Sequence, residues 1–352
     1  MMTGDRKKVV VGLSGGVDSA STVLLLQEKG YQVIGLYFDV IRNNDQGREM
    51  AEKGAKELGI DFIYRDMSGP FAEIVIENFC KEYRRGRTPN PCIICNPNIK
   101  FSVLLEEADR MGAQYIATGH YAKCSYFADD SAYLISMGEN KQKDQSYMLY
   151  RLPQEVLSRL ILPLGEIESK EDVRQLAKGR GLASARAKDS QEICFIHGNY
   201  RDYLDQKGIG SVPGNFIDEK GNVLGKHKGI TAYTLGQRKG LGVTLGKPAF
   251  VTKIDAVKNT VTLGDSDRLL THVVISDNNF FPETGGSLLP HRWEGMNIRA
   301  KVRYSVPPME GIISSQGDRV RVEFAEKQRA ATPGQSMVFY SGDRVIGGGW
   351  IR

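Results

Sequence analysis

The chain has 352 residues, of which 41% are hydrophobic and 25% charged, with a formal net charge of +5 at pH 7; this fits a globular protein with room for two or three domains. No apolar run approaches the ~20 residues of a membrane-spanning helix and the start of the sequence lacks a signal-peptide core, so we expect a cytoplasmic protein without a membrane partner. Five unevenly spaced cysteines exclude a disulfide framework and favour catalytic or metal-binding thiols.

The first predicted element is a strand that ends in a loop rich in glycine and serine. Residues 9–13 form an apolar run typical of a buried strand, and a helix follows the sequence SGGVDS (14–19). The loop therefore lies at a helix N-terminus, where unpaired amides favour an anion and the hydroxyl groups of Ser14 and Ser19 can donate to phosphate. Asp18 would repel a phosphate unless a cation lay between them, so we expect bound Mg²⁺. The absence of a Walker A lysine and of GxGxxG argues against a P-loop NTPase and a dinucleotide site.

This loop resembles the PP-loop of the ATP pyrophosphatase superfamily, whose members adenylate an oxygen atom and release pyrophosphate. The resemblance implies that ATP is held by the loop residues Gly12, Leu13, Ser14, Gly15, Gly16, Val17, Asp18 and Ser19.

Short apolar runs and helical patterns alternate through the first half of the chain. We expect strands over 31–38, 61–66 and 114–118, and helices over 48–58, 70–84 and 99–111. Strands separated by helices of this length indicate a parallel sheet that is covered on both faces and binds ligands at the carboxyl ends of its strands. SGGVDS, Phe38 and ATGHYA (117–122) would then converge on one crevice.

Two of the cysteines form a CxxC pair in a proline-rich segment. Cys92 and Cys95 lie in RTPNPCIICNP (87–97), which we interpret as a rigid loop followed by a helix. The spacing, the neighbouring arginines and the helix start all favour thiolates. A single CxxC is compatible with redox, zinc or cluster chemistry, and no second CxxC completes a zinc site. Cys194 precedes an apolar pair, a context that by itself favours a core cysteine.

The second half of the chain changes in character. Ser169 and Asp172 form a capping box that predicts a helix through Ala177. Glycine turns and short alternating segments beyond residue 208 predict small antiparallel units, and the strand-like segments after residue 270 predict a small barrel. We therefore predict an α/β catalytic domain with a parallel sheet over 1–205, a small central domain over 206–270 and a C-terminal β-barrel over 271–352.

Seven motifs, taken in order, resemble the tRNA-specific 2-thiouridylases along nearly the whole chain. They are SGGVDS (14–19), GRTPNPCIICN (86–96), ATGHYA (117–122), KDQSYML (143–149), KDSQEICFI (188–196), GKHKGITAYTLGQRKGLG (225–242) and ATPGQSMVFY (331–340). The resemblance implies a PP-loop (adenine nucleotide alpha hydrolase-like) sulfurtransferase that contacts tRNA through its central domain and barrel. Such an enzyme adenylates the C2 oxygen of the wobble uridine in the anticodon loop, replaces it by sulfur, and releases AMP and pyrophosphate.

The same resemblance implies roles for single residues, with Asp18, Cys95 and Cys194 as the catalytic ones. Cys194 corresponds to a cysteine that carries a persulfide, loaded by a sulfur-donor protein such as a cysteine desulfurase or a sulfur-relay protein, and Cys95 corresponds to the partner that attacks it. Gly119 approaches the nucleotide and Phe38 faces adenine. A target base flipped out of its stack would be held by Asn90, Pro91 and Cys92, and the tRNA would be contacted by His120, Lys143, Asp144, Gln145, Arg303, Tyr304 and Gln335.

Cys92 is the main departure from one branch of this family, whose members have an acid at this position. With Cys95 and Cys194 it supplies three thiolates, enough to hold an iron–sulfur cluster with one open iron for the transferred sulfide. A persulfide relay and a cluster-mediated transfer are therefore both open. The rival functions are another PP-loop enzyme, such as a small-molecule amidotransferase or a 4-thiouridine synthetase, and a tRNA-binding or iron–sulfur protein without thiolation activity.

Overall fold

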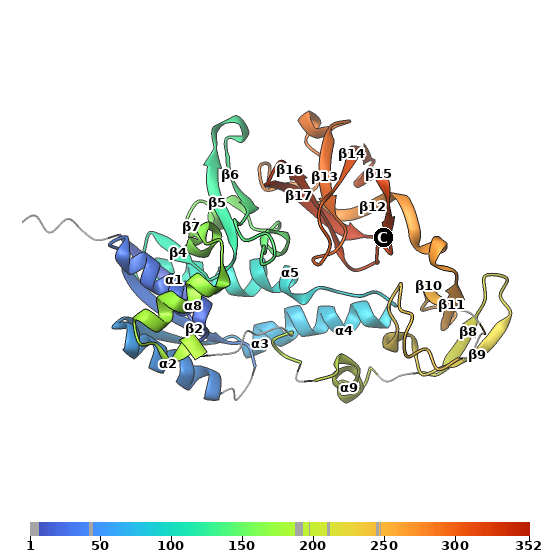
Figure 1. The fold of residues 1–352 in the computed structure, drawn as a ribbon, viewed down its shortest axis with the longest axis horizontal. Helices are drawn as coiled ribbons and strands as arrows, with labels where there is room; N and C mark the ends of the chain where they lie inside the picture. Colours follow the sequence, from blue (N-terminus) through green and yellow to red (C-terminus); the bar gives the residue numbers. More distant parts are fainter. Residues whose placement is uncertain are drawn as a thin grey trace, which may run out of the picture.

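The computed structural model describes residues 7–41, 45–186, 193–196, 198–209, 212–243, 246 and 248–352. Figure 1 shows an α/β region in blue and green, a barrel in orange and red, and a small sheet of strands β8 to β11 beyond the far end of helix α4. None of the helices described is both long enough and apolar enough to cross a membrane.

The α/β region is built on a parallel sheet, as predicted. Its strand order is β3-β2-β1-β4-β7, and every neighbouring pair is parallel. On β1, Val9 and Val11 pack on one face with residues of α1, α2 and α8, whereas Val10 packs on the other face with residues of α4 and α6. The elements are β1 (Lys8–Gly12), α1 (Val17–Glu28), β2 (Gln32–Asp39), α2 (Asp45–Leu58), β3 (Asp61–Asp66), β4 (Tyr115–Ala117), β7 (Leu160–Ile161) and α8 (Lys170–Gly179).

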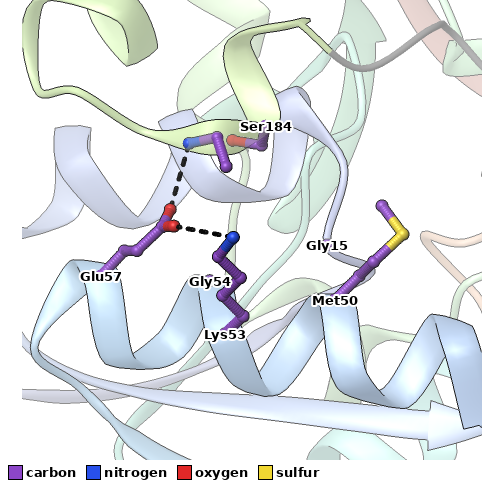
Figure 2. A pocket seen from close by; sticks show the side chains of 7 residues that line it. Gly15, Met50, Lys53, Gly54, Glu57 and Ser184 are labelled. Atoms are coloured by element: carbon purple, nitrogen blue, oxygen red, sulfur yellow. Dashed lines mark hydrogen bonds and ion pairs between the residues drawn. The ribbon is translucent and has the colours of Figure 1, made fainter.

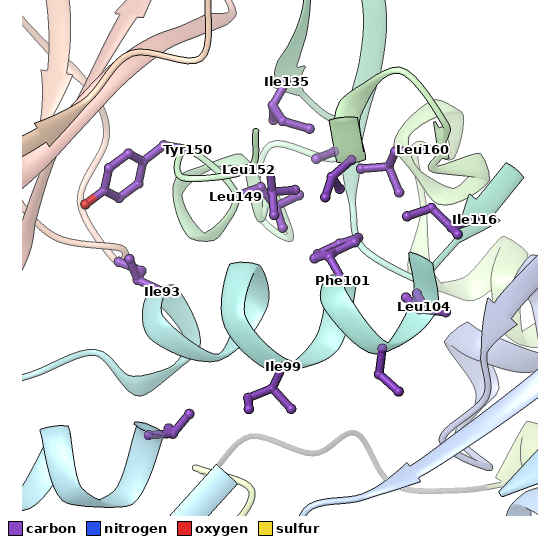
Figure 3. Packing of buried hydrophobic residues seen from close by; sticks show 14 of the residues in the cluster. Ile93, Ile99, Phe101, Leu104, Ile116, Ile135, Leu149, Tyr150, Leu152 and Leu160 are labelled. Atoms are coloured by element: carbon purple, nitrogen blue, oxygen red, sulfur yellow. The ribbon is translucent and has the colours of Figure 1, made fainter. Parts of the chain in front are cut away.

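Two long helical runs lie between β3 and β4. The first joins α3 (Ser68–Phe71), the π-helical η1 (Ala72–Ile76) and α4 (Glu77–Arg84), and the second joins α5 (Pro91–Cys95), the π-helical η2 (Asn96–Lys100) and α6 (Phe101–Arg110). The predicted cysteine loop is thus wrong, because Cys92 and Cys95 lie inside a helix. Asn90 starts this helix, since its Oδ1 accepts a hydrogen bond from the amide of Cys92 at 3.1 Å, and Pro91 suits the first helical position. Figure 3 shows Ile93, Ile99 and Phe101 of this run within the core.

A hairpin that the sequence analysis did not predict connects the α/β region with the barrel. Strands β5 (Ala122–Phe127) and β6 (Ala132–Met137) pair with each other, and Ser136 of β6 pairs with Arg344 of β17. Next to this junction, Asp130 is buried and forms ion pairs with Arg292 at 2.6 Å and Arg344 at 2.9 Å. The hairpin therefore extends the sheet of the barrel.

The predicted barrel is present. It runs β12-β15-β14-β13-β16-β17 and closes by pairing β12 with β17. Its strands are β12 (Leu270–Phe280), β13 (Asn297–Lys301), β14 (Met309–Gln316), β15 (Arg319–Arg329), β16 (Ser336–Ser341) and β17 (Arg344–Ile351).

The small central sheet has the order β10-β11-β8-β9. It is mixed rather than purely antiparallel, because β11 and β8 are parallel. Its strands are β8 (Gly214–Ile217), β9 (Val223–His227), β10 (Phe250–Asp255) and β11 (Thr260–Gly264), and two short helices elsewhere are α7 (Gln154–Leu157) and α9 (Tyr200–Gln206).

Candidate active site

The loop after β1 is held in shape by its own polar groups. The hydroxyl of Ser19 accepts a hydrogen bond from the amide of Ser14 at 3.2 Å and donates one to the carbonyl of Gly16 at 3.0 Å. Gly15 has a φ of +78°, and a Cβ there would lie 3.0 Å from the Cβ of Met50, so this position requires glycine. The amides at the start of α1 are therefore presented on a rigid turn, as an anion site needs.

Three segments meet at the carboxyl ends of β1, β2 and β4. A Cβ on Gly12 would lie 3.8 Å from the ring of Phe38, which places that ring beside the loop. A Cβ on Gly119 would lie 3.0 Å from the carbonyl carbon of Asp18 and 3.1 Å from its Cβ. The absence of a side chain at Gly119 therefore lets ATGHYA pack directly on the loop, and the predicted convergence of the three segments is present.

Asp18 has partners that the sequence analysis did not anticipate. Its Oδ1 lies 2.5 Å from Nζ of Lys170 and accepts a hydrogen bond from the hydroxyl of Tyr121 at 2.7 Å. Lys170 is the first residue of α8, and it was missed because it lies 152 positions from Asp18 in the chain. The ammonium also lies 5.6 Å from the centre of the Tyr121 ring.

Asp18 is also the one carboxylate of the loop, so it is the loop residue that would hold a Mg²⁺ ion. No three His, Cys, Asp or Glu residues in the described part of the chain are grouped as metal ligands. Mg²⁺ nevertheless is often held by one or two carboxylates together with substrate phosphates. A single carboxylate beside an anion loop therefore fits a Mg²⁺ ion that arrives with a nucleotide.

A cavity of about 310 Å³ lies on the α2 side of the loop, behind Gly15 (Figure 2). On its wall, Glu57 accepts a hydrogen bond from the amide of Ala183 at 3.1 Å and lies 4.0 Å from Nζ of Lys53. Glu57 thus fixes the segment Ala183–Arg186 against α2. The chain continues into 187–192, outside the described residues, so the first part of the KDSQEICFI motif also lies outside them.

The cysteine helix and Cys194 approach each other from different segments. Asn96 holds the helix by donating from Nδ2 to the carbonyl of Met148 at 2.8 Å. Cys194 is exposed, whereas the next residue, Phe195, is buried with its ring centre 5.5 Å from that of Phe71. Phe195 therefore anchors this segment while the side chain of Cys194 stays exposed, so the core position that the apolar pair favoured for Cys194 is wrong.

At Cys92, Cys95 and Cys194, burial raises the pKa of the thiol by more than nearby positive charge lowers it. Burial raises the pKa of Cys95 to about 12, with a further increase from the neighbouring Cys194, and it raises the pKa of Cys194 to about 11. The pKa of Cys92 is also raised by burial. The ammonium of Lys100 lowers all three pKa values without cancelling the effect of burial. Burial therefore acts against the thiolates that the sequence pattern favours, and the charge of Lys100 acts for them.

A contact between Lys100 and His120 links the thiol helix, which is the helical run α5-η2-α6 that carries Cys92 and Cys95, to the loop 14–19. Nζ of Lys100 lies 3.4 Å from Nε2 of His120, and the hydroxyl of Thr118 lies 2.7 Å from Nδ1. Burial, and then the charge of Lys100, lowers the pKa of His120 well below its usual value, so the imidazole is neutral. Because Gly119 precedes His120 and packs on Asp18, contacts run continuously from the loop to the thiol helix. No motif in the sequence pointed to Lys100.

The predicted tRNA contacts in KDQSYML are partly internal. Asp144 is buried, and its carboxylate accepts hydrogen bonds from the amide of Gly138 at 3.2 Å and the hydroxyl of Ser146 at 2.8 Å. Gln145 donates its amide to the carbonyl of Tyr121 at 2.8 Å and accepts from the Tyr121 amide at 3.0 Å. A surface role for the Asp144 carboxylate is thus contradicted, because the carboxylate points inward, and Lys143 is half-buried in the same turn.

A barrel segment, residues 330–335, holds the chain just ahead of Asn90, and we call it the barrel clamp. Within it, Nε2 of Gln335 donates to the carbonyl of Thr88 at 2.7 Å, and the carbonyl of Pro333 accepts from the Thr88 amide at 2.9 Å. A Cβ on Gly334, whose φ is +90°, would lie 3.0 Å from the Thr88 amide nitrogen. Gln335 is therefore an interdomain contact in this structure.

The two other predicted barrel residues lie beside the clamp. Arg303 donates hydrogen bonds to the carbonyl of Ala330 and the hydroxyl of Thr332, which braces the clamp. The pKa of Tyr304 is raised by burial, then by the charges of Asp144 and Cys92. Its ring centre lies 6.1 Å from that of Tyr147, so the ring packs against the KDQSYML segment.

The three thiols of the site do not form a cluster-binding set. All five cysteines are free, and Cys92, Cys95 and Cys194 are not among any metal-ligand grouping of the described residues. This arrangement of the described residues does not support an iron–sulfur cluster.

Comparisons with known proteins cover the whole chain. Residues 7–198 match the family model for the tRNA methyl transferase HUP domain, 201–265 that for the tRNA methyl transferase PRC-barrel domain, and 274–351 that for the aminomethyltransferase beta-barrel domain. A protein of Acetivibrio thermocellus described as tRNA-specific 2-thiouridylase MnmA is 43% identical over 364 residues, covering 99% of each chain. Proteins with the same description from Syntrophomonas wolfei and Clostridium perfringens strain 13 are 43% and 44% identical, and cover 98% and 99% of this chain and 99% of their own.

Proposed function

The chain belongs to the family of tRNA-specific 2-thiouridylases, and on this premise we propose that it converts the wobble uridine of tRNA anticodon loops to 2-thiouridine by ATP-dependent sulfur transfer. The observation that carries the proposal is the run of contacts from Asp18 through Gly119 and His120 to Lys100. In support of the proposal, this run connects the loop with the helical run that carries Cys95. Activation of an oxygen and its replacement by sulfur could then take place at adjoining positions.

The first step is adenylation of the uridine. A carbonyl oxygen is a poor leaving group, and transfer of AMP from ATP to the C2 oxygen, with release of pyrophosphate, makes it a good one. The loop 12–19 would bind the phosphates through its amides, and Phe38 and Gly119 would adjoin the nucleotide. Mg²⁺, held by Asp18 and the phosphates, would neutralise phosphate charge.

The second step is sulfur transfer from a persulfide on Cys194. A sulfur-donor protein, such as a cysteine desulfurase or a sulfur-relay protein, would load the exposed thiol of Cys194. Attack of the Cys95 thiolate on Sγ of Cys194 breaks the persulfide bond, forms a Cys95–Cys194 disulfide and releases sulfide. The sulfide attacks C2 and AMP leaves with the original oxygen. A thiol reductant then restores both cysteines.

The tRNA substrate would be held around the thiol helix. Asn90, Pro91 and Cys92 would receive the flipped base, and Tyr304 would contact the tRNA. Lys143 and His120 would adjoin the tRNA backbone or base, and Arg303 and Gln335 would act through the barrel clamp. Because all five thiols are free, we infer a reducing, cytoplasmic location.

The test is an anaerobic assay with full-length protein, unmodified tRNA, ATP, Mg²⁺ and a cysteine desulfurase with cysteine as the persulfide donor, read out by nucleoside mass spectrometry, with iron measured in the same sample. We expect 2-thiouridine from iron-free protein. Asp18→Ala should abolish Mg²⁺-dependent pyrophosphate release, and unchanged release would show that Asp18 has no such role.

Two other results would redirect the proposal. Product that appears only with stoichiometric iron would replace the persulfide route by a cluster on Cys92, Cys95 and Cys194. No thiolated nucleoside under either condition would indicate another PP-loop substrate or a tRNA-binding role.

A further inference from the structure

We propose that Lys170 is the phosphate-binding cation of the nucleotide site, and that it exchanges Asp18 for the terminal phosphates when ATP binds. This inference rests on the proposed function and adds a binding residue that no part of the loop motif contains.

The loop lacks positive charge of its own. Residues 12–19 contain no Lys or Arg, and their one ionisable side chain is the carboxylate of Asp18. Backbone amides and a helix dipole give only partial charges, whereas the triphosphate of ATP carries several full negative charges. A fixed side-chain cation therefore has to come from elsewhere in the fold.

Lys170 is positioned to supply that cation. Its Nζ lies 2.5 Å from Oδ1 of Asp18, and 15% of its side chain is exposed, against 36% for Asp18. The exposed carboxylate means that the pair lies at the open side of the loop rather than in the core. Lys53, near Gly15, differs: 69% of its side chain is exposed, and its ammonium is turned to Glu57.

The backbone at Lys170 is held firmly against the loop. Ser169 caps α8 by accepting a hydrogen bond from the amide of Glu171 at 3.1 Å. Ser21 of α1 donates to the carbonyl of Val173 at 3.1 Å in a buried contact. Because α1 and α8 are locked in this way, the ammonium of Lys170 can turn from one anion to another without movement of either helix.

The same two helices carry a second ion pair that serves as the control. Arg180, after the last turn of α8, lies 3.0 Å from Glu28 at the end of α1. If the Lys170–Asp18 pair only joined the helices, breaking either pair would have the same kind of effect. A phosphate-binding lysine predicts a difference that depends on the ligand.

The experiment is isothermal titration of full-length protein with ATP, pyrophosphate and adenosine, without tRNA. Lys170→Met should weaken binding of ATP and pyrophosphate by about 10- to 100-fold, the loss expected for one charge-assisted hydrogen bond, and should leave adenosine binding unchanged. Arg180→Met should change none of the three. Lys170→Arg keeps the charge and should retain most of the phosphate affinity.

A second variant covers the case in which Lys170→Met does not fold. Asp18→Asn removes the competing carboxylate, so in metal-free buffer it should bind pyrophosphate at least as tightly as the wild type, provided that Lys170 meets the phosphate. Weaker binding by Asp18→Asn, or equal losses in Lys170→Met and Arg180→Met, would overturn the proposal. Failure of the wild type itself to bind ATP would instead overturn the proposed function.

Discussion

The nucleotide loop and the thiol site differ in where their geometry comes from. The loop is shaped by residues that are neighbours in the chain, with Ser14, Gly16 and Ser19 bonded to one another. The thiols of Cys95 and Cys194 come from separate segments and are brought together by a capped helix and by the buried ring of Phe195. The loop is thus formed before any ligand arrives, whereas the two thiols are free and burial raises their pKa values.

This difference indicates that the loop is ready to bind its ligand, whereas the thiols need a change in their surroundings before they react. A preformed anion site suits a ligand such as ATP, which is always present in the cell. Thiols with raised pKa values are poor nucleophiles until their surroundings change, which guards a sulfur-transfer site against side reactions. The following predictions separate the two regions, in order of decreasing effect.

Replacement of Cys194, the proposed site of the persulfide, should affect the thiol site and leave the nucleotide loop unchanged. Cys194→Ser should abolish formation of 2-thiouridine, because the proposed persulfide forms on the Cys194 thiol, and should leave ATP affinity unchanged. Nucleoside mass spectrometry and ATP titration measure the two effects. Cys80→Ala, which removes a buried thiol outside the site, is the control. Residual 2-thiouridine from Cys194→Ser would show that the sulfur travels another way.

The protonation state of Cys194 should appear as a steep pH dependence. Its pKa is raised to about 11, so the thiolate fraction falls as pH decreases from that value. Alkylation of Cys194 by iodoacetamide should accelerate by about tenfold per pH unit between pH 7 and 9. Peptide mass spectrometry gives the rate, and a plateau near pH 7 would mean that the thiol is already ionised.

A methyl group added at Gly119 should lower ATP affinity without a direct effect on the thiols. The added Cβ in Gly119→Ala would lie 3.0 Å from the backbone of Asp18, and relief of this contact should distort the loop at a cost of about 1–2 kcal/mol, or roughly tenfold in ATP affinity. Gly179→Ala, where a Cβ meets open space, is the matched control. Equal ATP affinity in both variants would refute the close approach.

Weakening of the barrel clamp should have the smallest effect on activity, and this effect should concern sulfur transfer rather than ATP binding. Gln335→Ala removes one hydrogen bond to Thr88, worth about 0.5–1.5 kcal/mol. A positioning role predicts a several-fold fall in kcat with unchanged KM for tRNA. The exposed Gln316 of the same barrel provides the control, Gln316→Ala. A rise in KM alone would assign Gln335 to direct tRNA contact.

The sequence predicted what short-range patterns encode. The apolar run of β1, the strands and helices that alternate after it, and the strand-like segments after 270 correctly indicated the sheet and the barrel. Asn90 followed by Pro91 is a strong helix start, so the start of α5 could have been predicted from the sequence. The three prolines around the cysteines favoured a loop instead. Lys170, Lys100 and the barrel clamp could not be found in this way, because each acts on residues distant in the chain.

The β5–β6 hairpin has a consequence for the order in which the protein folds during synthesis. Asp130 and its partner Arg344 are 214 positions apart, so the hairpin leaves the ribosome long before the strand that pairs with β6. Until β17 arrives, the hairpin presents a bare sheet edge and a carboxylate without its arginines, and such edges invite association with other chains. The catalytic region therefore completes its fold only when the last barrel strand is made, and a nascent chain halted before β17 should depend on chaperones.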